Sequence, residues 1–85
     1  MKVKADDIIS TLLSMGDEMQ RANLMRFFKT GKGEYGEGDQ FIGIKVPDTR
    51  LVVKEARLKV PLEDIEVLLA SEWHEVRLCG LLLLV

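Results

Sequence analysis

A row of three basic residues is the feature of this 85-residue chain best suited to bind a ligand. Arg50, Lys54 and Arg57 follow one another at spacings of four and three residues, which places them on one face of a helix. Such a row of cations can follow the phosphates of a nucleic-acid backbone. The alternative is a solvated helix surface on which the same side chains pair with Asp48 or Glu55.

A glycine-rich segment precedes that helix, and its backbone amides could cradle an anion. Between Lys32 and Asp39 the sequence reads KGEYGEGD, which lacks the Gly-Lys-Ser/Thr ending of a phosphate-binding loop. Its three acidic residues would also repel the phosphates of a nucleotide. The sequence therefore favours an ordered connector over a nucleotide site.

Trp73, His74 and Cys79 have side chains that could stack on a base, transfer a proton or act as a nucleophile. Trp73 stands near a helix start, where packing against the preceding helices is the commoner role. His74 has no cysteine, second histidine or carboxylate at metal-ligand spacing, which predicts an exposed histidine at a helix start. The leucines around Cys79 would raise the pKa of its thiol, which predicts a buried, unreactive side chain. No metal or other cofactor is expected.

The composition, with 47% hydrophobic and 31% charged residues, is typical of one small soluble domain. The single cysteine excludes an internal disulfide, and a cytoplasmic location is the default expectation. The last apolar run is much shorter than the roughly 20 residues of a membrane span, so no membrane association is expected. The net charge is -2, but residues 41–60 carry five basic and two acidic side chains. Positive charge is thus concentrated around the basic row.

Apolar residues at helical spacing, together with capping and proline signals, predict about five helices. Gly16 ends the first helix, and Asp17 with Gln20 forms a capping box for the second, which ends near Lys29. The short turn between these helices predicts an antiparallel pair. The predicted apolar stripe of the second helix consists of Met19, Ala22, Met25 and Phe28.

Prolines mark the starts of two later helices, with Pro47 in the third and Pro61 in the fourth. Ser71 can cap a fifth helix that begins at Glu72. The predicted fold is all-α, with antiparallel helical pairs of a HEAT-like solenoid in a single unit covering 1–85. It comprises a helical pair over 1–30, a glycine-rich connector over 31–46 and helices over 47–85. The apolar residues expected to anchor the connector are Phe41, Ile42, Ile44 and Val46.

The stretch from Arg26 to Arg50 resembles the N-terminal region of the bacterial DNA alkylation repair enzymes, the AlkD-like alkylpurine DNA glycosylases. The resemblance runs from about Asp17 to Val85. It is strongest at FFKT (27–30), GEYGEGD (33–39) and FIGIKVP (41–47). It implies a solenoid of HEAT-like helical pairs that cradles duplex DNA.

The resemblance also implies roles for two residues outside the basic row. Phe27 matches a position where some relatives have a tyrosine near the DNA, although a phenylalanine in the core is the simpler interpretation. Lys45 lies in the segment that borders the DNA-facing groove in the family. The candidate DNA-binding residues are therefore Phe27, Lys45, Arg50, Lys54 and Arg57. The family's catalytic aspartate lies in later helical pairs, so this 85-residue chain alone is expected to be inactive.

From Leu78 onward every residue is apolar or glycine, which predicts a helix that should be covered on all sides. This pattern suggests an N-terminal piece of a longer solenoid, which would form homo-oligomers through the exposed helix. Two functions remain at this point. One is a DNA-cradling part of an alkylpurine DNA glycosylase without its catalytic residues, and the other is a noncatalytic HEAT-like module that binds proteins.

Overall fold

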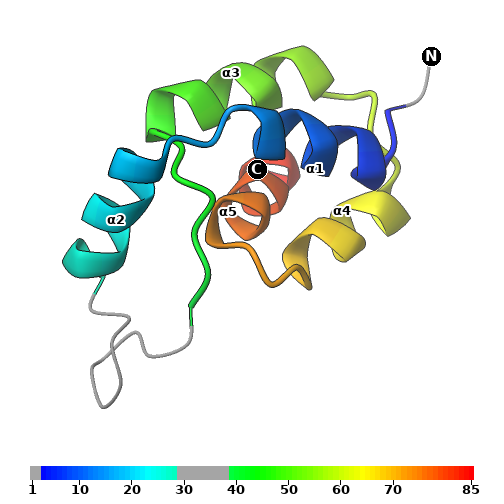
Figure 1. Cartoon of the computed structure of the whole chain (residues 1–85). Coiled ribbons are helices and arrows are strands. Elements are labelled where there is room, and N and C mark those ends of the chain that lie inside the picture. Colours follow the sequence, from blue (N-terminus) through cyan, green and yellow to red (C-terminus); the bar gives the residue numbers. More distant parts are fainter. Residues whose placement is uncertain (1–2, 29–38) are drawn as a thin grey trace.

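The computed structural model describes residues 3–28 and 39–85, and in these ranges the chain forms five α-helices and no strand (Figure 1). The prediction of an all-α fold is therefore confirmed. The helices are α1 (Ala5–Ser14), α2 (Glu18–Phe27), α3 (Val46–Ala56), α4 (Leu62–Leu69) and α5 (His74–Leu84).

The helix ends follow the predicted capping signals with small shifts. The Asp17 carboxylate accepts a hydrogen bond from the Gln20 amide at 3.1 Å, as the capping pattern predicted. Pro61 is the N-cap of α4. The expected start of α5 is wrong, because the helix begins at His74 with Trp73 as its N-cap. The Ser71 hydroxyl instead accepts a hydrogen bond from the Trp73 amide at 3.2 Å, in the turn before the helix.

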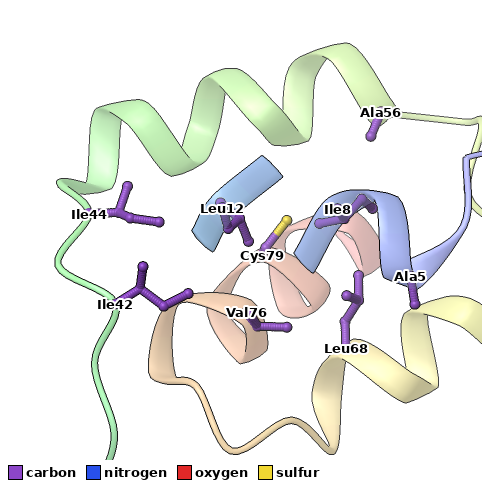
Figure 2. Packing of buried hydrophobic residues seen from close by; sticks show 9 residues of the cluster. All are labelled: Ala5, Ile8, Leu12, Ile42, Ile44, Ala56, Leu68, Val76 and Cys79. Atoms are coloured by element: carbon purple, nitrogen blue, oxygen red, sulfur yellow. The ribbon is translucent and has the colours of Figure 1, made fainter. Parts of the chain in front are cut away.

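Four of the helices, α1, α3, α4 and α5, surround one apolar core. The most extensive packing is between α4 and α5, while α3 packs on α5 and α1 contacts all three. The core side chains converge between these helices (Figure 2), and they are Ala5, Ile8, Leu12, Ile42, Ile44, Ala56, Leu68, Val76 and Cys79. Burial raises the pKa of Cys79 to about 11, so the predicted inert, buried cysteine is confirmed.

The α2 helix lies apart from this core, and this corrects the expected pairing with α1. It does not pack against any of the other four helices (Figure 1). None of its residues is buried. It is tied instead to the chain that leads into α3. The Asp17 amide donates to the Gly43 carbonyl at 3.0 Å, and the Arg21 Nε donates to the Phe41 carbonyl at 3.0 Å. The expected apolar stripe therefore covers little, and Met19 is largely exposed.

Residues 39–45 form the approach to α3 and pass between α2 and the core helices. Phe41, Ile42 and Ile44 are buried as predicted, whereas Val46 is about half exposed and does not anchor the chain. Gly43 adopts a φ of 99°, and a Cβ there would collide with the Asp17 carbonyl oxygen. The interpretation of the glycine-rich stretch as an ordered connector falls largely on residues 29–38, which lie outside the described part of the chain.

The second half of α5 is only partly covered. Leu81 and Leu84 are 53% and 50% exposed, while Cys79 and Gly80, directly before Leu81, are buried. The expectation of an apolar helix with an uncovered side thus agrees with the structure. Within residues 3–28 and 39–85, no helix is long and apolar enough to cross a membrane.

Candidate nucleic-acid interface

The exposed side of α3 presents the predicted cations to solvent. Lys45 is the N-cap of α3, and Arg50 and Lys54 follow along the helix; all three are exposed. Within the described residues, their side chains make no hydrogen bond or ion pair, so the alternative pairing with Asp48 or Glu55 is not found there. Cations without an acidic partner are free to contact an external anion.

Arg57 departs from the predicted helical row. It is the C-cap of α3 with φ −54° and ψ 133°, so its backbone is extended and the helical face ends with Lys54. Arg57 occupies the second position of a type II turn over 56–59. In that turn the Lys59 amide donates to the Ala56 carbonyl at 3.0 Å, and Leu58 has a φ of 67°. Arg57 is exposed, but it extends the row from the end of the helix and not from its face.

Phe27 is exposed, and this corrects its interpretation as a core residue. The residue is 77% exposed, and its ring contacts Phe28 edge to face, with ring centroids 5.1 Å apart. Because α2 does not pack on the core helices, the Phe27 side chain at its end remains largely in solvent. The structure therefore places Phe27 on α2 and the four cations on and beside α3, two elements that do not pack on each other.

A buried carboxylate fixes the approach to α3. Glu75 is almost fully buried at the start of α5, and its carboxylate accepts three backbone hydrogen bonds. The donors are the amides of Ile42, Gly43 and Ile44, at 2.9, 2.8 and 3.1 Å. An ionised carboxylate is a strong acceptor for such amides. Glu75 therefore holds the segment that ends at Lys45 against the core.

A second polar cluster, around Asp39, joins the beginning of the same segment to α5. Asp39 accepts a hydrogen bond from Arg77 and contacts Nδ1 of His74 at 3.0 Å. Burial raises the pKa of Asp39, but the hydrogen bonds from Arg77 and His74 outweigh it, so the net pKa lies below its usual value. The backbone adds a hydrogen bond from the His74 amide to the Gln40 carbonyl at 2.8 Å.

His74 is partly buried and has a carboxylate partner, so the predicted exposed histidine is wrong. Its ring stacks on Phe41 with centroids 4.5 Å apart and lies 5.0 Å from the Phe28 ring. Phe28 and Phe41 are themselves stacked at 5.2 Å. The predicted packing of Trp73 is confirmed, since its side chain lies against the core cluster.

Sequence reasoning missed Asp39 and Glu75 as structural residues. Glu75 reads locally as an acid in the first turn of a helix, where the dipole favours any carboxylate. Asp39 reads as part of an acidic loop. Their partners lie more than 30 positions away, and no local spacing reveals such a pair. Among the described residues there is no group of three or more His, Cys, Asp or Glu side chains that could hold a metal ion.

The geometry agrees with the comparison of the sequence with protein families. The profile of the family described as "DNA alkylation repair enzyme" matches residues 8–85, which is most of the chain. The chain belongs to the DNA alkylation repair enzyme family. Searches of the curated proteins and of the solved structures found no match.

In this DNA alkylation repair family member, the sheltered carboxylates of the described residues already have structural partners. Glu75 binds three amides and Asp39 binds Arg77 and His74. Asp64, the third partly buried acid, accepts a hydrogen bond from the Ala5 amide at 3.0 Å. The other described carboxylates are exposed.

Proposed function

We propose that this chain forms a DNA-contacting part of a DNA alkylation repair protein, of the kind that removes alkylated purines by cleaving their glycosidic bonds. The observation that carries the proposal is the exposed basic edge of α3, defined by Lys45, Arg50, Lys54 and Arg57. These four cations lack acidic partners in the described residues and occur in a chain of a DNA repair family. Phe27, exposed on α2, is a fifth candidate contact.

The 85 residues are proposed to bind DNA without cleaving it. In the described part, the carboxylates that are sheltered from solvent, Asp39, Asp64 and Glu75, make hydrogen bonds that hold the fold together. The catalytic aspartate implied by the family resemblance would then come from further helical pairs. The proposed place of action is the cytoplasm, in keeping with the free thiol of Cys79.

Salt-dependent DNA binding tests this proposal. A fluorescein-labelled duplex of about 20 base pairs would be titrated with the protein by fluorescence anisotropy between about 50 and 200 mM salt. The variant Arg50→Ala/Lys54→Ala is expected to bind more weakly, and the slope of log K against log salt should fall by about one per lost phosphate contact.

The control Lys4→Ala/Arg26→Ala removes the same charge from exposed positions on α1's N-cap and α2. It should leave the salt slope close to that of the wild type. Equal effects of both variants would reduce the binding to overall charge and contradict a role for α3. Release of 3-methyladenine or 7-methylguanine from methylated DNA by the purified chain would contradict the noncatalytic part of the proposal.

A noncatalytic HEAT-like module that binds protein is the second candidate, and the exposed apolar residues of α2 favour it. Met19 and Phe27 are largely exposed on a helix that packs on none of the other four helices. Exposed apolar patches often mark protein interaction sites. Absence of any DNA binding at low salt would leave this candidate as the better one.

A further inference from the structure

The turn that follows α3 presents an apolar side chain to solvent. Leu58 is 98% exposed, and its backbone has a φ of 67°. Left-handed backbone is unfavourable for an L-residue, and glycine or asparagine is the usual choice at this position of a type II turn. Neither burial nor backbone preference therefore accounts for a leucine here. Residues held in strained backbone conformations cluster at functional sites.

The turn is held in place from both sides. The Lys59 amide donates to the Ala56 carbonyl at 3.0 Å within the turn, and the Lys59 carbonyl accepts from the Val3 amide at 2.9 Å. Ala56, the first residue of the turn, is buried in the core. Leu58 consequently stands on a fixed backbone, so little backbone freedom would be lost if its side chain were inserted into a partner.

The residues around Leu58 are mostly cationic. Arg57 and Lys59 flank it directly, and Lys54 lies one helical turn before; all three are exposed. Glu55 is the only acidic residue between Lys54 and Lys59. An apolar tip between cations fits a partner that presents anions on both sides of an apolar crevice. In duplex DNA, the phosphates line the grooves and the stacked base pairs lie between them.

We propose that Leu58 is an apolar wedge that enters the minor groove of duplex DNA bound along α3, with Arg57 and Lys59 contacting the flanking phosphates. This inference rests on the proposed function and deepens it, because it names a residue that deforms the bound duplex. Leucine is among the side chains that proteins insert between base steps, where they partly unstack the bases and kink the duplex. The wedge would stand at the end of the basic edge, where α3 stops and the chain turns away from the helix axis.

A fluorescent base analogue reports such unstacking. Duplexes with 2-aminopurine at successive positions would be titrated with the protein, and both anisotropy and 2-aminopurine emission would be measured. Binding of the wild type should raise the emission at one or two positions. Leu58→Gly should abolish this rise and weaken binding by up to about tenfold. The glycine variant should remain folded, because glycine adopts the required φ without strain.

Leu58→Ala and Leu62→Ala form a matched pair of leucine truncations. Leu62 is also well exposed, at 62%, but it begins α4 beside the acidic Glu63. The alanine at position 58 should reduce the 2-aminopurine signal, and the alanine at position 62 should not. Circular dichroism would confirm that each variant is folded.

The outcomes separate this inference from the proposed function. Salt-dependent binding in which wild type and Leu58→Gly give the same affinity and emission would overturn the wedge and leave the basic edge intact. Absence of wild-type binding to any duplex would overturn both. Vesicles of phosphatidylglycerol provide the remaining arm: binding to them that depends on Leu58, without a Leu58 effect on DNA, would assign the turn to a membrane surface and overturn the wedge.

Discussion

Glu75 shows how one buried carboxylate can organise a segment more than 30 residues away. The amides of Ile42, Gly43 and Ile44 belong to no helix or sheet ladder, so their hydrogen bonds must come from elsewhere. Buried amides without an acceptor are costly, and Glu75 supplies all three acceptor sites. The same interaction fixes the direction in which the chain reaches Lys45 and enters α3.

The variant Glu75→Gln tests this role. A carboxamide has one acceptor oxygen and one donor nitrogen, so it cannot accept from all three amides in the same geometry. We expect the free energy of unfolding to fall by about 3 kcal/mol, measured by urea denaturation. The control Glu72→Gln changes an exposed acid just before α5 and should alter stability by less than about 0.5 kcal/mol. Similar stability of the two variants would mean that the hydrogen bonds accepted by Glu75 contribute little to the free energy of unfolding.

The contact between the approach to α3 (residues 39–45) and α5 also depends on charged side chains. Asp39 binds Arg77 and His74, which both lie on α5, while Glu75 binds the approach from the same helix. The first turns of α5 are therefore attached to residues 39–44 by two carboxylates. Asp39 belongs to the approach and Glu75 to the helix, so a substitution in either segment can test this contact.

Acid should weaken the contact of Asp39 with Arg77 and His74. The pKa of Asp39 lies below its usual value in the folded chain, because the hydrogen bonds from Arg77 and His74 outweigh the opposing effect of burial. Its stabilising contribution is complete above the unfolded pKa of about 4 and is lost as the pH falls through the lower folded pKa. The stability difference between wild type and Asp39→Asn, from urea titrations, should therefore shrink from pH 5 towards pH 3. A difference that stays constant over this range would contradict the prediction.

The sequence predicted the helices well and their partners less well. Apolar spacing and the two prolines located α1, α3 and α4, and the apolar run beginning at Leu78 located the exposed part of α5. The same spacing indicated an apolar side on α2 but carried no information about what would cover it. The actual partner of α2 is the extended approach, reached through Asp17 and Arg21. Hydrogen bonds to the backbone carbonyls of a distant segment depend on tertiary structure and leave no periodic signal.

The candidate site was predictable to a similar extent. The charges of Arg50 and Lys54 indicated an exposed basic face, and the structure places both there without acidic partners in its described residues. The spacing to Arg57 assumed that the helix continued, whereas it ends at Ala56. That early end creates the turn in which Leu58 is exposed, a feature that residue spacing could not reveal because it depends on a positive φ.

Across the molecule, apolar surface is distributed unevenly. The other three core helices, α1, α3 and α4, bury one side of α5, but its C-terminal end exposes Leu81, Leu84 and Val85. Covering several hundred square ångströms of such surface at roughly 25 cal/mol per Å² would be sufficient to drive association. Of the possible partners, a second copy of the chain presents the same surface at the same concentration, and a two-fold arrangement would bring the two faces together.

We therefore expect the protein to self-associate through α5. Sedimentation equilibrium between about 5 and 200 µM should show a dimer or higher oligomer, since burial of this surface would give a dissociation constant in or below the micromolar range. Leu81→Ser/Leu84→Ser should shift the equilibrium towards monomer, because replacing leucine with serine removes most of the apolar side-chain area without adding charge. Leu13→Ser/Met19→Ser, a matched change at exposed residues of α1 and α2, should not. A folded wild type that stays monomeric at the highest concentration would show that the end of α5 tolerates solvent, and that its exposed leucines do not form an interface between copies.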